Sequence, residues 1–270
     1  MNKPLKIDLE EILHEKLPKV NLPKPVVRFL KRTIHLEEIN ECFVRYPNSR
    51  GIEFARDVLA YLDATISIEN IENLPHGGRY IFVSNHPLGG LDGVALAYHV
   101  GREYEGKVRL FANDFLMYLE PLSDILIPVN KVGGQGRENL ERMQQFYESE
   151  NHLITFPAGV CSRKVNGKIT DLEWKKHFVA KAVEYQRDVV PIYFQGRNSD
   201  FFYNLSNFRK FCGIKLNMEM LFLPDEMFKQ KGNHFTVKIG KPIAWQTYDK
   251  SKTYPEWAER TKKDVYSLSK

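Results

Sequence analysis

The sequence predicts an α/β protein with a mostly parallel central sheet flanked by helices, preceded by an N-terminal helical arm. Two observations support this fold class. From residue 66 onwards, short β-branched and aromatic runs alternate with helical segments, which is the order that parallel strands and crossover helices produce. Residues 26–66 instead show helical spacing of apolar side chains. We therefore place the arm at residues 1–65 and the α/β domain at residues 66–270.

The composition is that of a globular chain with a sizeable core. Of its 270 residues, 43% are hydrophobic and 27% are charged. The formal charge is +5, but no dense block of Lys and Arg occurs, so we expect no nucleic-acid partner. A moderately basic surface suits an anionic membrane face, and it is equally what ordinary solubility requires.

The cysteines and the apolar runs bear on the compartment. Cys42, Cys161 and Cys212 are widely spaced and form no CxxC pair, which argues against a disulfide framework and against a metal site such as zinc. The first twenty residues lack the apolar segment of a secretory signal, and no run of about 18 apolar residues occurs anywhere. We expect a cytoplasmic protein whose contact with a membrane is peripheral.

The helical arm leaves two interpretations open. Residues 17–25 are predicted to be an extended connector, because prolines recur there. Residues 26–43 and 51–66 each place apolar side chains on one helical face, with a turn at residues 46–51. These helices either form a cap that faces a membrane or a substrate, or simply pack on the main domain.

The α/β domain is predicted from five runs that resemble strands, with helices between them. The strands are expected at residues 79–85, 107–114, 124–131, 152–159 and 188–196. Helices are expected at residues 91–100, 115–122, 137–150 and 173–186. Two further strands at residues 217–224 and 234–243, and a helix at residues 255–269, complete the prediction.

Glycine-rich or polar loops follow the carboxyl ends of four predicted strands. They are SNHPLGGLDG at 84–93, NKVGGQGR at 130–137, PAGVCSR at 157–163 and QGRNS at 195–199. The carboxyl ends of parallel strands share one edge of a sheet, where open α/β proteins bind their ligands. We therefore expect these loops to line one crevice.

The first of these loops contains a candidate general base. His86 carries an imidazole that titrates near neutral pH, and Asp92 is close enough to hold the other ring nitrogen if the chain folds back. Pro87, Gly89 and Gly90 are the residue types that such a turn needs. In the alternative interpretation, His86 and Asp92 are turn residues and Asp92 caps the following helix.

The next two loops contain candidate anion-binding groups. Lys131 and Arg137, with the backbone N–H groups between them, suit a phosphate or a carboxylate, although a flexible turn explains the glycines equally well. Arg163 can bind an anion through two parallel hydrogen bonds. Cys161 raises a rival hypothesis, in which its thiol and His86 form a nucleophilic pair, although a small buried residue explains it too.

Taken in order, these loops resemble the four sequence blocks of the PlsC-like lysophospholipid acyltransferase superfamily, over roughly residues 65 to 245. His86 and Asp92, preceded by Asn85, resemble the first block; ILIPVNK with Lys131 resembles the second; FPAGVCSR resembles the third; VVPIYFQG resembles the fourth. Three departures are visible. One extra residue separates His86 from Asp92, Ala158 replaces the usual Glu, and Arg163 comes one position late.

The resemblance implies an activity. His86 would deprotonate the hydroxyl of a lyso-lipid, Asp92 would orient it, and the hydroxyl would attack the thioester of acyl-CoA or acyl-carrier protein, with no further cofactor. The implied substrate-binding residues are Lys131, Arg137, Phe156, Pro157, Gly159, Ser162 and Arg163. The family implies peripheral attachment to the inner face of the cell membrane, where residues 26–66 would take the place of N-terminal membrane helices.

HPLGGLDG and ITDLEWKKHFVAKA further resemble a bacterial, hemolysin-like branch linked to acylating lyso-ornithine or lyso-glycine lipids. Ala158 weakens the case for lysophosphatidic acid as the acceptor. Two other hypotheses remain open: a non-catalytic protein that binds lipids or anions, and a thioester hydrolase that depends on Cys161.

Overall fold

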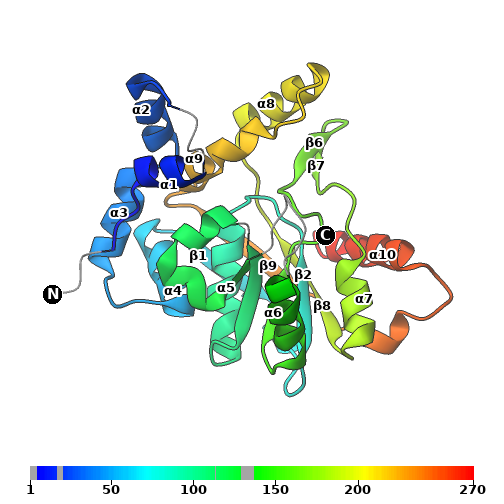
Figure 1. Cartoon of the computed structure of the whole chain (residues 1–270). Coiled ribbons are helices and arrows are strands. Elements are labelled where there is room, and N and C mark those ends of the chain that lie inside the picture. The colour runs from blue at the N-terminus through cyan, green and yellow to red at the C-terminus, as the bar shows by residue number, and fades with distance from the viewer. Residues whose placement is uncertain (1–4, 17–20, 113, 129–136) are drawn as a thin grey trace.

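The computed structural model describes residues 5–16, 21–112, 114–128 and 137–270. Within these residues, a seven-stranded sheet has the strand order β1-β9-β8-β2-β5-β3-β4 (Figure 1). The strands are β1 (Thr65–Glu69), β2 (Tyr80–Ser84), β3 (Val108–Ala112), β4 (Leu126–Pro128), β5 (His152–Thr155), β8 (Asp188–Phe194) and β9 (His234–Ile239). Neighbouring strands are parallel except β8 and β9. The predicted mostly parallel sheet is confirmed.

Helices cover both faces of this sheet (Figure 1). They are α1 (Leu9–Lys16), α2 (Lys24–Thr33), α3 (Leu36–Arg45), α4 (Gly51–Tyr61), α5 (Leu91–Glu103), α6 (Arg137–Glu148), α7 (His177–Glu184), α8 (Asp200–Phe211), α9 (Leu223–Phe228) and α10 (Tyr254–Ser267). Short 3-10 turns include η2 (Asp114–Tyr118), η3 (Glu120–Ile125), η4 (Met218–Phe222) and η5 (Trp245–Thr247).

The central strand β2 divides the core into two halves, because its side chains point alternately to either face of the sheet. Phe82 packs into the half formed with α4 and α5, whereas Ile81 and Val83 pack into the half formed with α6, α7 and α10. All five residues of β2 are buried. A strand covered on both faces reads as a continuous apolar run, which is why the sequence identified it so clearly.

Part of the N-terminal arm belongs to the first half of the core. Phe43 of α3 and Phe54 of α4 are buried there, with ring centroids 5.7 Å apart. Helix α4 lies against α5, where Ile52 comes so close to Gly101 that a β-carbon at Gly101 would stand 2.7 Å from it. Of the two interpretations of this arm, packing on the main domain therefore holds for α4.

Several local predictions were wrong. The apolar stripe predicted one helix over residues 26–43, but His35 adopts a left-handed conformation with φ of 53° and separates α2 from α3. Residues 217–224 form η4 and the start of α9, not a strand. Helices α1 and α8 were not predicted. Neither was a small antiparallel hairpin, β6 (Arg163–Val165) and β7 (Lys168–Thr170).

Candidate active site

The strand order brings three of the four predicted loops together. Strand β2 lies between β8 and β5, so the loops after these three strands are neighbours at one edge of the sheet. Backbone and side-chain contacts join them: the Ser162 N–H donates to the His86 carbonyl at 2.7 Å, and the Asn198 amide lies 3.4 Å from the Leu88 carbonyl. Of the fourth loop, predicted at 130–137, residues 130–136 lie outside the described residues.

His86 and Asp92 meet within the first loop. Nδ1 of His86 lies 2.9 Å from Oδ2 of Asp92, which confirms the contact expected from the turn. The same carboxylate oxygen accepts from the N–H of Leu88 at 3.0 Å and of Gly89 at 3.3 Å. Oδ1 accepts from the N–H of Gly93 at 3.0 Å. The turn is therefore folded around the carboxylate of Asp92.

The Asp92 carboxyl is ionised although it is completely buried. Burial by itself raises a carboxyl pKa, but here the charge and hydrogen bond of His86, with the N–H groups of Leu88 and Gly89, outweigh that effect and hold the pKa of Asp92 below its ordinary value of 3.8. A fixed carboxylate at Nδ1 favours the tautomer with the proton on that nitrogen and stabilises the imidazolium form.

Gly89, one of the two adjacent glycines of this turn, is required by its surroundings. Gly89 has φ of +78°, a conformation that strains any residue with a β-carbon. A β-carbon there would also lie 2.8 Å from the side chain of Leu223 and 3.1 Å from Cys161. The extra residue between His86 and Asp92 is thus accommodated by a tight left-handed turn that leaves the pair in contact.

The imidazole of His86 stacks on an aromatic ring and is partly exposed. Its ring stacks on Phe156 with centroids 3.9 Å apart and planes inclined by 20°, and its side chain is 16% exposed. No hydrogen-bonding partner for Nε2 occurs among the residues that the structure describes. With Nδ1 on Asp92, the remaining ring nitrogen is the one that a substrate hydroxyl can reach.

Asp171 supports this arrangement and was not predicted as a site residue. Its Oδ1 accepts from the backbone N–H of His86 at 3.2 Å and from the Ser162 hydroxyl at 2.5 Å, and its Oδ2 accepts from Trp174 Nε1 at 2.9 Å. Helix α10 holds the backbone of Asp171 through the hydroxyl of Tyr266, 2.7 Å away. The segment ITDLEW contributes to the resemblance to the bacterial branch. No local sequence pattern, however, indicates that its aspartate contacts a histidine 85 positions away.

The third-block residues have different environments. Phe156 contacts His86, as described, and Gly159 makes a left-handed turn with φ of +70°. Pro157 is buried, and its carbonyl accepts from the Lys175 N–H at 3.0 Å. The Lys175 ammonium lies 3.1 Å from the place that a β-carbon of Gly159 would take. Lys175 therefore places a cation beside this turn, and the sequence analysis did not predict Lys175 as a site residue.

Ser162 and Arg163 correct the sequence-based prediction. Ser162 is buried and its hydroxyl is bonded to Asp171, so it positions the loop of His86. Arg163 is 2% exposed, and its guanidinium donates to the Cys161 carbonyl at 2.6 Å and to Glu219 at 3.0 Å. A guanidinium engaged in this way is not presented to an anionic substrate. The prediction failed because Glu219 is 56 residues distant in the sequence.

Cys161 is not an activated nucleophile in this structure. Its side chain is completely buried, and its sulfur accepts from Arg163 at 2.9 Å. Burial, only partly opposed by the guanidinium, raises the pKa of the Cys161 thiol to about 11. Little thiolate exists near neutral pH at such a pKa, which removes the basis for a hydrolase that depends on this residue.

The predicted cations of the second block are not described. Lys131 lies outside the described residues, and Arg137 begins α6 with its side chain likewise outside them. Their contacts with a substrate therefore stay predictions. The part of the chain that is described contains no group of three or more His, Cys, Asp or Glu side chains placed to hold a metal ion.

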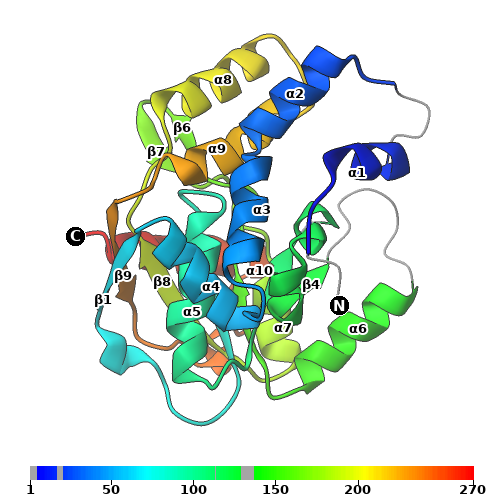
Figure 2. The same cartoon turned by 90° about the vertical axis from the view of Figure 1, so that its left-hand side faces the viewer.

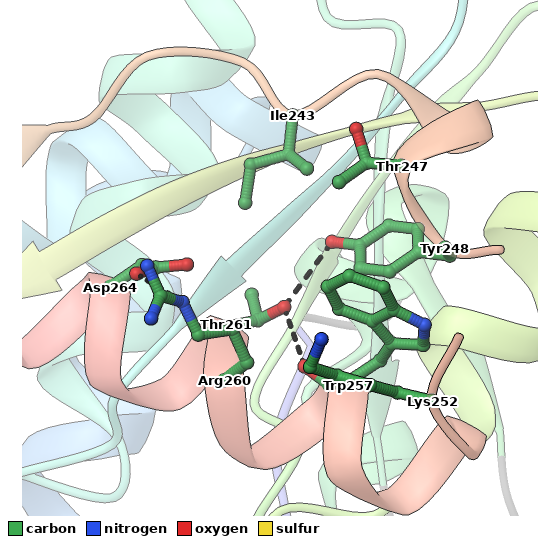
Figure 3. A pocket seen from close by; sticks show the side chains of 8 residues that line it. All are labelled: Ile243, Thr247, Tyr248, Lys252, Trp257, Arg260, Thr261 and Asp264. Carbon is green, nitrogen blue, oxygen red and sulfur yellow. Dashed lines mark hydrogen bonds and ion pairs between the residues drawn. The ribbon is translucent and has the colours of Figure 1, made fainter.

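A hollow of about 400 Å³ lies away from His86. It is formed by residues of η5, of the loops on both sides of η5 and of α10, including Ile243, Tyr248 and Trp257 (Figure 3). Ile243 pairs with Val189 near the amino end of β8, whereas His86 follows the carboxyl end of β2. Figure 3 shows the Tyr248 hydroxyl directed at that of Thr261, and the two oxygens are 3.3 Å apart. The ion pair at the hollow joins Arg260 to Asp264, and its labelled residues include no histidine.

Comparison with known proteins bears on this site. The crystal structure of the 1-acyl-sn-glycerophosphate acyltransferase PlsC from Thermotoga maritima superimposes with a TM-score of 0.52 and 17% identity, over 89% of this chain and 95% of that one. At that identity the likeness concerns the fold. The sequence profile of the family described as Acyltransferase matches residues 11–270. The chain belongs to this acyltransferase family.

Two curated relatives of the acyltransferase are much closer in sequence. A lyso-glycine lipid O-acyltransferase from Bacteroides thetaiotaomicron is 50% identical over 264 residues, covering 97% of each chain. One from Phocaeicola vulgatus is also 50% identical over 264 residues, covering 97% of this chain and 95% of its own. These matches confirm the expected PlsC-like family and an enzyme that transfers acyl groups. They do not support the alternative of a non-catalytic protein that binds lipids or anions. None of the acyltransferase's described helices is both long and apolar enough to cross a bilayer.

Proposed function

We propose that this acyltransferase moves a fatty acyl group from acyl-CoA or acyl-carrier protein to the hydroxyl of a lyso-glycine lipid, with His86 as the general base. The contact between His86 and the buried Asp92 is the observation that carries this proposal. The acceptor follows from the names of the two relatives that are 50% identical over nearly the whole chain.

The chemistry begins at Nε2 of His86. This nitrogen takes the proton of the acceptor hydroxyl while the oxygen attacks the thioester carbonyl carbon. The tetrahedral intermediate collapses by breaking the carbon–sulfur bond, and the imidazolium returns its proton to the departing thiolate. Asp92 stabilises the imidazolium in between, because its carboxylate stays ionised at the opposite ring nitrogen.

A carboxylate on the acceptor fits the charges around the third block. Ala158 stands where a glutamate would place a negative charge, and it is buried. Lys175 adds a cation beside the same turn. We propose that Lys131, Arg137 and Lys175 provide the positive charge that a glycine-lipid carboxylate needs, since a cation stabilises a carboxylate at short range.

We also propose that the enzyme acts as a peripheral protein on the inner face of the cell membrane. A lyso-lipid acceptor resides in a bilayer, whereas acyl-CoA and acyl-carrier protein are dissolved donors, so the reaction needs a surface where both meet. The three cysteines are free, as in a protein of a reducing compartment.

The direct test uses purified protein, palmitoyl-CoA or palmitoyl-acyl-carrier protein, and a panel of lyso-lipids, with the product identified by mass spectrometry. We expect transfer to lyso-glycine lipid, and a loss of about 100-fold or more in kcat for His86→Ala. His76→Ala, at an exposed histidine four residues before the amino end of β2, is the matched control and should retain full activity.

Cys161→Ala separates the two chemistries. We expect it to keep transfer activity at a temperature where the variant is folded, because the thiol takes no part in the proposed steps. Full transfer by His86→Ala, or a loss confined to Cys161→Ala, would contradict the proposed mechanism. Transfer only to lysophosphatidic acid would contradict the proposed acceptor.

A further inference from the structure

Exposed apolar side chains are concentrated on one part of the molecule. Of the fourteen large apolar side chains that are exposed in the described structure, nine lie in α2 or within residues 200–222. Among these nine, the largest exposures are those of Phe211 at 90%, Leu216 at 73% and Phe208 at 62%. Such a concentration on a monomer marks an interaction site, whereas scattered apolar residues do not.

The two segments form one surface, which we call the apical surface and define as α2 (Lys24–Thr33) with residues 200–222. Phe222 of η4 joins them, since its ring centroid lies 6.4 Å from that of Phe29 and 5.2 Å from that of Phe201. Both views show α2 and α8 projecting from the same end of the molecule, beyond the sheet (Figures 1 and 2).

The apical surface has more exposed cations than acids. Its exposed acid, Asp200, is paired with Arg197 at 2.7 Å, and Glu219 is buried against Arg163 and Arg209. Lys210 and Lys215 are exposed. Helix α2 contains four basic residues and no acidic one. Its exposed Arg28 and Arg32 have no charged partner among the described residues. The exposed apolar groups are thus accompanied by unneutralised positive charge.

The apical surface borders the candidate active site. Five residues separate the start of helix α8 from the carboxyl end of β8, the strand next to β2. Leu223, directly after η4, fills the space beside Gly89 in the turn of His86. A layer that covers the apical surface therefore lies close to the turn that contains His86.

We propose that the apical surface binds an anionic lipid bilayer, with the tip of α8 and residues 212–218 inserted among the headgroups. Apolar side chains with adjacent lysines are what an interfacial segment needs, and each cation near an anionic leaflet adds to its attraction. A second copy of the chain fits less well, because a two-fold contact would place the same cations against each other. The proposed lipid acceptor explains why the enzyme would bind a bilayer, and in that respect this inference rests on the proposed function. The exposed apolar side chains and the cations are independent of it.

The first experiment measures cosedimentation of the full chain with vesicles of phosphatidylcholine mixed with phosphatidylglycerol. The variant Phe208→Ser/Phe211→Ser/Leu216→Ser should bind the vesicles at least about tenfold more weakly, since it removes three apolar side chains that would insert into the bilayer. The control Val44→Ser/Ile71→Ser changes exposed apolar residues away from the apical surface and should bind as the wild type does.

A charge arm tests the choice of an anionic bilayer. Lys210→Glu/Lys215→Glu should weaken vesicle binding about tenfold, and added salt should weaken wild-type binding. Lys241→Glu/Lys250→Glu, with the same charge change near the amino end of β8, should not. Equal binding by all variants, or variants that lose only self-association, would overturn the proposal.

Activity separates this inference from the proposed reaction. The serine variant should keep its turnover of acceptor dispersed in detergent micelles and lose turnover of acceptor embedded in vesicles. If the wild type binds vesicles through the apical surface but acylates no acceptor, the proposed function fails and the surface stands. If it acylates acceptor in micelles but does not bind vesicles, the surface is wrong and the function stands.

Discussion

At the scale of single residues, the site depends on a carboxylate that is charged and out of reach of water. Burying an unpaired carboxylate is very unfavourable, and Asp92 avoids this with three backbone N–H donors besides His86. The same contacts determine the geometry of the turn, so they also determine the position of the imidazole. His86 then needs only the Phe156 ring beneath it to fix its plane.

Asp171 does not contact the imidazole itself; it is a positioning residue that holds the backbone of His86. Asp171→Ala removes the acceptor for the His86 N–H and for Ser162, so we expect kcat to fall about tenfold to 100-fold while KM changes little. Asp171→Asn keeps one carbonyl oxygen and should recover part of the loss. Steady-state kinetics of variants with checked folding would show this split.

The matched control is Asp249→Ala, at an exposed aspartate far from the turn, which should leave kcat unchanged. A purely structural Asp171 would predict a different result: unfolding of the Ala variant, or full kcat in the part that stays folded. Either outcome would remove the positioning role.

At the scale of elements, a buried ion cluster fixes the chain between α8 and α9 to the third-block loop. Glu219 of η4 accepts from Arg209 of α8 at 2.8 Å and from Arg163 at the start of β6 at 3.0 Å. All three side chains are buried. The exposed segment 212–218 is therefore anchored by Arg209 and Glu219, which flank it in the sequence, and not by packing of its own side chains.

Glu219→Gln should loosen this segment. Removing one member of a buried ion cluster leaves its partners without compensation, so we expect the free energy of unfolding to fall by about 3 kcal/mol. Urea denaturation measures that loss, and limited proteolysis should cut sooner within residues 212–218. Glu72→Gln removes the same charge at an exposed position and should change neither; equal stability of the two variants would contradict the proposed anchor.

At the scale of the whole molecule, the packed core contains a histidine that stays neutral. His152, at the start of β5, accepts from the Tyr80 N–H through Nδ1 at 3.2 Å and stacks on the Tyr80 ring at 5.4 Å. Burial, with the nearby charge of Arg187, lowers the pKa of His152 from 6.5 to about 4. Protonating this ring would require charge in an apolar interior.

This predicts a pH dependence of stability. Between pH 6.5 and about 4 the unfolded chain binds a proton at residue 152 that the folded chain does not, so the free energy of unfolding should fall as the pH is lowered. The loss from this residue is at most about 3 kcal/mol. Chemical denaturation at a series of pH values measures it.

His152→Asn keeps an acceptor for the Tyr80 N–H and removes the titration, so its stability should depend less on pH over this range. His99, whose pKa burial also lowers to about 4, contributes a slope that this variant retains. An unchanged slope in His152→Asn would show that residue 152 does not titrate on unfolding.

The errors of the sequence prediction have physical causes. Residues 217–224 form a short, mostly apolar run like that of a strand. Glu219, however, is buried against Arg163 and Arg209, and helix α9 begins at Leu223 with Pro224 in its first turn. Helix α8 shows no clear stripe because several of its aromatic side chains face outward on the apical surface. The β6–β7 hairpin was recognisable: Asn166 and Gly167 both have positive φ, as the Asn-Gly turn of a hairpin requires.

The sequence by itself determined the mostly parallel sheet, and it placed His86 and Asp92 in one turn where their contact was one of two interpretations. Both depend on short-range patterns: alternation of buried strands with helices, and a glycine turn that spans six positions. The tertiary structure alone decided the roles of Asp171, Ser162 and Arg163. Whether a polar side chain faces a substrate or the interior depends on which distant group neutralises it on burial, and such partners leave no trace in the local sequence.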